Sequence, residues 1–198
     1  MYEEFYGFKE RPFALVPDPS FLYLSKGHGT ALTLLRYSIM NRQGFTVVSG
    51  EVGSGKTTLV NRLLDELKTG VTVGLINFTT RTFGDMAEWI MMAYGLPYKN
   101  KGKVELYEDF VQFMIREYAA GRPVVLIVDE AQNLGIRGLE EIRMLSNVNA
   151  QKEYLLHVIL VGQPELRALL QTPQPRKSKI LRSPTFQLYT PMSRHNKT

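Results

Sequence analysis

One short stretch of this sequence has the residue types and the spacing to bind phosphate. Residues 50–57 read Gly-Glu-Val-Gly-Ser-Gly-Lys-Thr and fit the pattern G-x-x-x-x-G-K-[ST], after an apolar run and before a helical pattern. Glycines let the backbone curl with its N–H groups turned inward, where a β-carbon would obstruct an anion. We therefore predict a nucleotide-phosphate site formed by this loop and the residue after it: Gly50, Glu51, Val52, Gly53, Ser54, Gly55, Lys56, Thr57 and Thr58.

Two side chains of the loop have predicted roles of their own. Lys56 can reach the β- and γ-phosphates of a nucleotide, and we predict that it takes part in catalysis. The Thr57 hydroxyl is suited to ligate Mg²⁺, which keeps most of its water and takes few protein ligands. The predicted cofactors are therefore ATP and Mg²⁺.

A second element of nucleotide hydrolysis follows further along the chain. Residues 124–128 are all apolar, which predicts a buried strand, and Asp129 and Glu130 stand at its carboxyl end, where α/β sheets bind ligands. We predict that Asp129 holds the metal and that Glu130 accepts a proton from the attacking water as general base. Two acids after a strand would otherwise be solvated surface groups, and the phosphate loop earlier in the chain is what favours the catalytic interpretation.

Two isolated residues are further candidates. Gln163 follows an apolar strand pattern at the same predicted sheet edge, where it could orient the attacking water or sense the γ-phosphate. His28 stands between two glycines before the first predicted helix and could lie against the base of the nucleotide. The alternatives are an ordinary loop glutamine and a surface histidine.

These residues need a scaffold, and the periodicity of the sequence supplies one. Apolar residues at helical or strand spacing predict helices over 30–43, 56–68, 83–94, 104–119, 139–147 and 164–170, and strands over 45–49, 71–77, 124–129 and 155–161. A further strand over 185–190 has weaker support. Continuous apolar strands that alternate with helices predict an α/β fold with a parallel sheet covered on both faces.

Composition limits what else the chain can be. Its 198 residues are 44% hydrophobic and 22% charged, which is typical of a soluble globular domain. The absence of cysteine excludes disulfides and thiolate chemistry. We see no run of about 18 apolar residues that could span a membrane, and acids stand where an export signal would be basic, so we expect a cytoplasmic protein.

The net charge of +5 is unevenly distributed. Residues 171–198 hold six Lys and Arg, no acid and four of the ten prolines, whereas residues 1–170 hold 18 basic and 19 acidic residues. We therefore divide the chain into an N-terminal arm (1–29), a core (30–170) and a basic tail (171–198) that includes the weaker strand. The tail is interpreted as a solvated chain end, with contact to nucleic acid or an anionic membrane as the alternative.

Several stretches of the chain together resemble the AAA+ ATPases of the ExeA/GspA general secretion type. They are the aromatic and proline-rich residues 2–8, 12–13, 17–19 and 21–25, the phosphate loop, and residues 129–134, 139–147 and 161–166. The resemblance implies a three-layer α/β/α core and a Mg²⁺-dependent ATPase that oligomerises. It also implies that the arm and His28 neighbour the adenine and that Gln163 takes the sensor position.

The resemblance further implies an oligomeric motor or assembly factor in secretion or cell-envelope processes, with a membrane-associated secretion partner at the inner face of the membrane. Members of this family continue into a helical lid, so we expect the lid to be missing here and hydrolysis to be slow. Arg182 roughly matches an arginine that acts across a subunit boundary. The alternative is an ATP-dependent DNA-binding regulator of transposition, which similar ATPases and the basic tail suggest.

Overall fold

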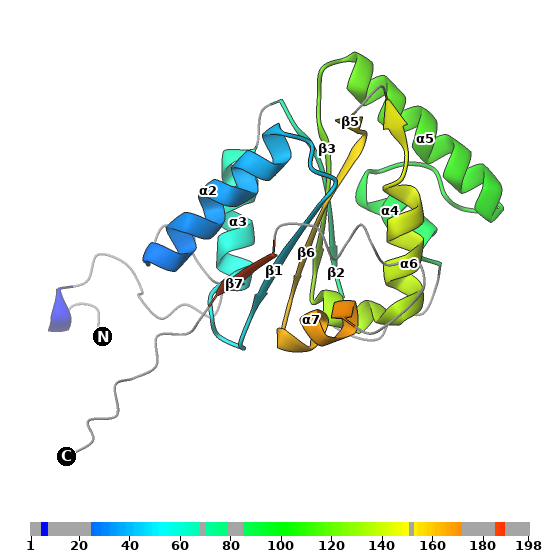
Figure 1. The fold of residues 1–198 in the computed structure, drawn as a ribbon. Helices are drawn as coiled ribbons and strands as arrows, with labels where there is room; N and C mark the ends of the chain where they lie inside the picture. Colours follow the sequence, from blue (N-terminus) through cyan, green and yellow to red (C-terminus); the bar gives the residue numbers. More distant parts are fainter. Residues whose placement is uncertain are drawn as a thin grey trace.

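A five-stranded sheet with helices on both faces forms the body of the molecule (Figure 1). The computed structural model describes residues 5–7, 25–67, 70–78, 85–150, 153–171 and the backbone of 185–188. The strands are β1 (Phe45–Gly50), β2 (Thr72–Asn77), β3 (Val124–Asp129), β6 (Leu156–Gly162) and β7 (Thr185–Leu188). They pair in parallel in the order β2-β3-β6-β1-β7, which confirms the predicted parallel sheet.

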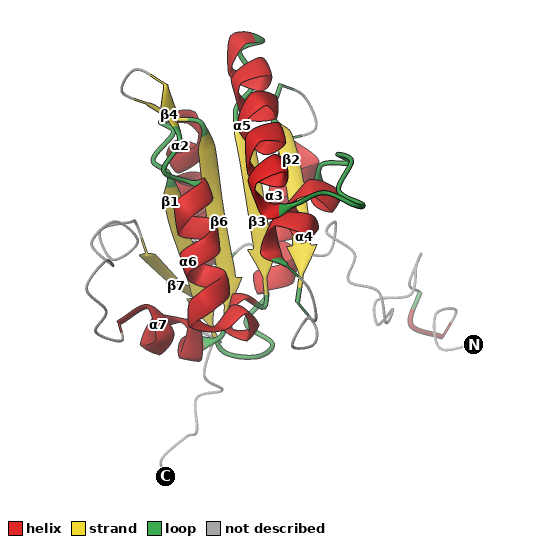
Figure 2. Cartoon of the chain, turned by 90° about the vertical axis from the view of Figure 1, so that its right-hand side faces the viewer, coloured by secondary structure: helices red, strands yellow, loops and turns green. Residues whose placement is uncertain are grey.

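Two groups of helices cover the two faces of the sheet. On one face lie α2 (Lys26–Met40) and α3 (Lys56–Glu66). On the other, which faces the viewer in Figure 2, lie α4 (Met86–Ala93), α5 (Lys103–Ala119), α6 (Gly135–Leu145) and α7 (Pro164–Gln171). A one-turn 3₁₀ helix, η2 (Ala131–Leu134), leads into α6. None of the helices in the described ranges is long and apolar enough to cross a bilayer.

The core lies in two layers because successive strand residues point to opposite faces. In β3, Val125 and Ile127 pack with α2 and α3, whereas Val124, Leu126 and Val128 pack with α4 to α7. Every residue of β1, β3 and β6 is buried. This burial on both faces explains why these three strands are apolar almost throughout rather than alternating.

Two helices begin four residues before their predicted start, while the other helices differ from their predicted bounds by smaller amounts. The first begins at Lys26 rather than at residue 30, because the Ser25 hydroxyl caps it by accepting a hydrogen bond from the His28 N–H. The helix predicted over 139–147 begins at Gly135, before the apolar spacing becomes visible, and ends at Leu145. The small antiparallel pair β4 (Asn149–Ala150) and β5 (Glu153–Tyr154) was not predicted.

The ends of the predicted core also shift. Residues 26–29 belong to α2, so the predicted boundary after residue 29 cuts a helix. The weaker strand prediction near residue 185 is confirmed, since β7 pairs with β1 at the edge of the sheet. Most of the predicted arm and tail lies outside the described residues, including Arg182.

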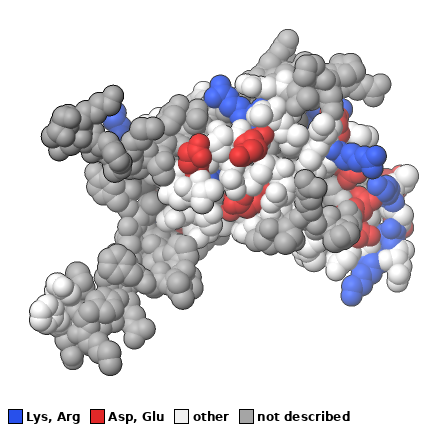
Figure 3. Space-filling model, turned by 90° about the horizontal axis from the view of Figure 1, so that it is seen from below, with Lys and Arg blue, Asp and Glu red and all other residues white. Residues whose placement is uncertain are grey.

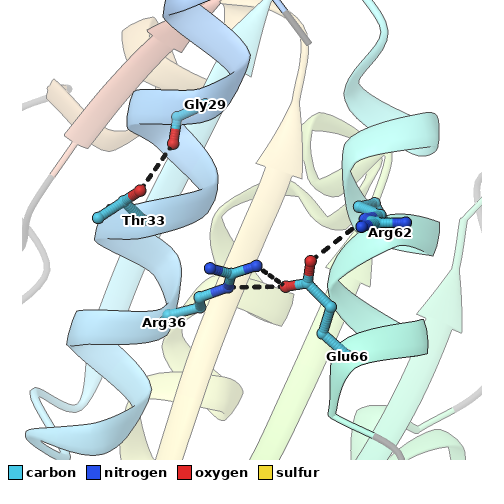
Figure 4. A network of polar contacts seen from close by, with 5 residues as sticks. All are labelled: Gly29, Thr33, Arg36, Arg62 and Glu66. Atoms are coloured by element: carbon cyan, nitrogen blue, oxygen red, sulfur yellow. Dashed lines mark hydrogen bonds and ion pairs between the residues drawn. The ribbon is translucent and has the colours of Figure 1, made fainter. Parts of the chain in front are cut away.

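An ion-pair network joins the two helices that flank the phosphate loop (Figure 4). The Arg36 Nε on α2 donates to Glu66 Oε2 over 2.7 Å, and the Arg62 Nε on α3 donates to Glu66 Oε1 over 3.2 Å. The arginine side chains are about half exposed, so each pair contributes at most about 1 kcal/mol. The network holds α2 and α3 side by side, and the buried apolar side chains of these two helices also belong to one cluster.

His157 is a buried titratable group beneath α2. Its Nε2 lies 3.3 Å from both the Ser38 and the Thr46 hydroxyl oxygens, and its Nδ1 is buried with no hydrogen-bond partner among the described residues. Burial lowers the pKa of His157 from 6.5 to about 4. The native state therefore holds this ring neutral.

This lowered pKa predicts a loss of stability in mild acid. The pKa of His157 is lower in the folded state than in the unfolded chain, so folding stability is highest above the unfolded pKa of 6.5. As pH falls toward about 4, the unfolded chain binds a proton that the folded state does not, and up to about 3 kcal/mol of stability is lost. His157→Gln places an amide near the Nε2 position and does not titrate. We expect the melting temperature of the parent to fall more than that of the variant between pH 7 and pH 4, and equal falls would show that His157 is not the group responsible.

Candidate active site

The carboxyl ends of three adjacent strands meet at one edge of the sheet, the lower edge in Figure 1. The phosphate loop follows β1, Asp129 ends β3 with Glu130 directly after it, and Gln163 follows β6, which lies between the other two. Figure 3 looks onto this edge from below and shows acidic side chains in the middle of the face, with Lys and Arg mainly toward its right-hand rim. The predicted residues therefore reach one region from three separate parts of the chain.

The backbone of the phosphate loop has the conformation that an anion site needs. Gly53 and Gly55 have φ of 76° and 83°, in the left-handed region that favours glycine. Gly55 directly precedes α3, and no side chain caps the N-terminus of that helix. The Ser54 hydroxyl is buried and has no hydrogen-bond partner among the described residues. Unpaired donors at a helix start, with a buried hydroxyl beside them, fit a phosphate group.

The Lys56 ammonium lies across the loop it belongs to. Its Nζ donates to the Gly50 carbonyl over 2.8 Å and to the Glu51 carbonyl over 2.9 Å, and the side chain is buried. The side chains of Glu51 and Val52 are exposed, and the Glu51 carbonyl is the group of this pair that contacts Lys56. Lys56 thus holds its charge at the mouth of the loop, where the phosphates were predicted.

The predicted metal residues lie in direct contact. The Thr57 hydroxyl donates to Asp129 Oδ2 over 3.2 Å, and Asp129 Oδ1 accepts from the Glu130 N–H over 2.9 Å. Asp129 is buried, and burial raises the pKa of its carboxyl above the ordinary value of 3.8. The described residues hold no group of three or more His, Cys, Asp or Glu side chains placed to hold a metal ion. One hydroxyl and one buried carboxylate fit Mg²⁺, which takes few protein ligands.

Glu130 and Gln163 also meet, which neither position alone could show. The Gln163 Nε2 donates to Glu130 Oε2 over 3.3 Å. Glu130 has φ of 53°, a left-handed conformation that is uncommon for a residue with a side chain. The chain turns sharply at this point, so the carboxylate of Glu130 faces β6 rather than following the direction of β3. Strained backbone of this kind is frequent at active sites.

His28 contacts the phosphate loop directly. Its Nε2 donates to the Ser54 carbonyl over 2.8 Å, and its Nδ1 accepts from the Ser25 hydroxyl over 2.6 Å. A β-carbon on Gly55 would lie 2.8 Å from the His28 Nε2, so only glycine lets the ring approach this closely. The expectation that His28 precedes the first helix was wrong: it lies in the first turn of α2, and both ring nitrogens are engaged by protein groups.

Sequence reasoning missed two residues at this site. Ser25 orients His28 by donating to its Nδ1. A serine directly before a helix is an N-cap signal, and this signal could have identified Ser25. Gln132 contacts both Glu130 and Gln163, and it lies in the stretch 129–134 that carries the family resemblance, which assigned it no role. Thr58 was predicted to bind phosphate, and it is half-buried in the first turn of α3.

The sequence matches a protein family model and a known protein. The AAA domain family matches residues 39–170, about two thirds of the chain. General secretion pathway protein A of Aeromonas hydrophila is 38% identical over 174 residues, which is 87% of this chain. The chain spans 32% of that relative's length.

Solved structures show the same fold at low sequence identity. The ORC2 protein of Aeropyrum pernix, solved as ADPNP–ADP complexes, superposes with a TM-score of 0.65 at 18% identity, over 92% of this chain and 52% of its own. Cdc6p of Pyrobaculum aerophilum gives 0.64 at 20% identity, over 88% and 50%. These similarities confirm the three-layer α/β/α core of the phosphate-loop ATPases.

The raised pKa of Asp129 predicts that this residue destabilises the ligand-free domain. The amide introduced by Asp129→Asn can still accept from the Glu130 N–H and donate to the Thr57 hydroxyl, and it carries no charge. We expect the melting temperature without ligand to rise at neutral pH by about 2–4 °C, the shift that corresponds to about 1 kcal/mol in a domain of this size.

The pH dependence of that gain has a definite sign. A raised folded pKa means that Asp129 costs no stability below its unfolded pKa, near 3.8, and costs most above its folded pKa. The advantage of Asp129→Asn should therefore shrink as pH falls toward 4. Calorimetric melting of both proteins from pH 7 to pH 4 checks this, and a variant that is less stable at neutral pH would contradict it.

Proposed function

The chain belongs to the AAA domain family and is an AAA+ ATPase of the ExeA/GspA type, and from this premise we propose that it binds ATP with Mg²⁺ and hydrolyses it at the sheet edge. The observation that carries the proposal is the meeting of two residue pairs at that edge. Thr57 contacts Asp129 beside the phosphate loop, and Glu130 contacts Gln163 at the end of the neighbouring strand. The residues that we propose for phosphate binding, metal binding and proton transfer therefore lie together.

Binding of the triphosphate would use donors that have no partner among the described residues, together with Lys56, which would change its partners. The N–H groups at the start of α3 and the Ser54 hydroxyl donate to phosphate oxygens, and Lys56 exchanges the Gly50 and Glu51 carbonyls for the β- and γ-phosphates. The acidic groups on the same face would repel a triphosphate. A cationic loop and a divalent metal are therefore needed to bind it.

Thr57 and Asp129 are the residues that would hold Mg²⁺, which when bound neutralises charge that develops on the β- and γ-phosphates. The Thr57 hydroxyl, which now donates to Asp129 Oδ2, would ligate the metal instead. The cation would also offset the cost of burying the Asp129 carboxylate. His28 fixes the Ser54 carbonyl, so the loop keeps its shape while these groups change partners.

Hydrolysis would proceed by attack of water on the γ-phosphorus. Glu130 accepts the proton as the oxygen–phosphorus bond forms, and the bond from the γ-phosphorus to the bridging oxygen breaks to leave ADP and inorganic phosphate. Gln163 lies within hydrogen-bond distance of the Glu130 carboxylate, where it can orient the same water or contact the γ-phosphate. Positioning and electrostatics thus supply the catalysis.

The wider role rests on the similarity to general secretion pathway protein A. We place the chain in an oligomeric motor or assembly factor of secretion or the cell envelope, in the cytoplasm near a membrane-associated partner. Slow turnover of this chain stays a prediction, as does oligomerisation. The alternative role as a DNA-binding transposition regulator is suggested by similar ATPases and by the basic tail 171–198. The basic side chains of that tail lie outside the described part of the chain, and nothing in the described residues favours the alternative.

ATP binding should depend on Lys56. Lys56→Ala removes the buried ammonium from the loop, and we expect its affinity for Mg²⁺-ATP, measured by calorimetry, to fall below detection. The matched control is Lys99→Ala, at an exposed lysine between α4 and α5, which should bind like the parent. Equal affinity in Lys56→Ala and the parent would overturn the assignment of the phosphate site.

Turnover should depend on Glu130 while binding does not. Glu130→Gln keeps the shape of the side chain and removes its basicity, so we expect phosphate release to fall by about 10²-fold or more with the ATP affinity preserved. Glu108→Gln on the exposed face of α5 is the matched control and should hydrolyse ATP at the parental rate. Parental turnover in Glu130→Gln would show that another group takes the proton.

A further inference from the structure

We propose that Gln132 is a positioning residue for ATP hydrolysis, one that holds the Glu130 carboxylate and the Gln163 main chain in a single geometry. The inference rests on the proposed ATPase function and adds a residue that does not itself touch the reacting atoms. It is carried by a closed set of hydrogen bonds among three residues from two strand ends.

The three residues form a ring of contacts. The Gln132 Nε2 donates to Glu130 Oε2, and the Gln132 Oε1 accepts from the Gln163 N–H over 3.1 Å. The Gln163 Nε2 closes the ring by donating to the same Glu130 Oε2 over 3.3 Å. The Gln132 side chain hydrogen-bonds to both other residues at once, through its Nε2 to one and its Oε1 to the other.

The ring fixes the orientation of the Gln132 amide. A carboxylate needs a donor, and a backbone N–H needs an acceptor. Turning the amide by 180° would place its oxygen against Glu130 and its nitrogen against the Gln163 N–H, and both contacts would be lost. A glutamine is therefore suited to this position, because it offers a donor and an acceptor at the end of one side chain.

Local backbone structure delivers Gln132 to this place. The 3₁₀ turn η2 begins directly after Glu130 and is closed by a hydrogen bond from the Asn133 N–H to the Glu130 carbonyl over 2.9 Å. On the other side, a β-carbon on Gly162 would lie 2.6 Å from the Gln132 Oε1. The end of β6 thus leaves room for this amide, and a larger residue there would displace it.

The ring has a consequence for the general base. Both amides donate to Oε2, and Glu130 Oε1 has no hydrogen-bond partner among the described residues. One carboxylate oxygen is therefore held while the other can receive the proton of the attacking water. Because Gln132 also holds the Gln163 main chain, a shift of Gln163 toward a γ-phosphate would be passed to Glu130.

The test separates positioning from a structural role. We expect Gln132→Ala to lower kcat by about tenfold or more, since misplacing a catalytic group by about 1 Å can cost up to 10²-fold. Its affinity for Mg²⁺-ATP should stay within about twofold of the parent, because no phosphate-loop contact is touched, and its melting temperature should stay close to that of the parent. Gln112→Ala, at an exposed glutamine of α5, is the matched control and should behave like the parent.

A second variant gives a readout that loss of packing would not produce. Gln132→Glu keeps an acceptor for the Gln163 N–H and places a second carboxylate against Glu130. Like charges raise the pKa of a carboxyl, so the acid limb of the kcat–pH profile should move to higher pH. Gln132→Ala removes one donor to Glu130 but adds no charge, so we expect a lower kcat with a smaller shift than in Gln132→Glu.

Two outcomes would overturn the inference and leave the ATPase function intact. One is parental kcat in Gln132→Ala while Glu130→Gln is inactive. The other is a Gln132→Ala that loses ATP affinity and thermal stability along with kcat, with no shift of the profile in Gln132→Glu, since that marks Gln132 as structural. A parent that binds no ATP or shows no turnover would instead refute the proposed function, and that failure is seen before any variant is made.

Discussion

The order of the strands in one parallel sheet is the constraint on which the candidate site depends. In a parallel sheet, neighbouring strands lie about 4.8 Å apart and end at the same edge. Because β6 lies between β1 and β3, the residues that follow these strands converge although they are distant in sequence. The buried apolar strands thus contribute to the chemistry indirectly, because the positions of their carboxyl ends determine where Lys56, Asp129 and Gln163 lie.

The same edge gathers charge that the ligand-free protein does not fully satisfy. Asp129 is a buried carboxylate with a raised pKa, and the Lys56 ammonium donates to two carbonyls of its own loop. Natural proteins commonly retain such unfavourable groups where function needs them. A nucleotide phosphate and a divalent cation would give Lys56 and Asp129 partners of opposite charge, so the cost in folding stability and the capacity for binding have one origin.

Sequence alone predicted the parts of this arrangement that are local. The phosphate loop and the two acids at the end of β3 follow from short patterns, and the fold follows from apolar strands alternating with helices. The contacts of Gln132 with Gln163, and of His28 with Ser54, join residues 31 and 26 positions apart, so no periodicity could show them. The early start of α6 was missed for another reason: its first turn carries an exposed Ile136 and no apolar stripe.

The most direct test of this account is a crystal structure of the chain with Mg²⁺ and a non-hydrolysable ATP analogue. The account predicts the triphosphate in the loop of residues 50–57, with the Lys56 Nζ moved from the Gly50 and Glu51 carbonyls to the phosphates. It also predicts the metal at the Thr57 hydroxyl on the Asp129 side. A nucleotide bound elsewhere, or a Lys56 that keeps its carbonyl partners with the analogue present, would contradict it.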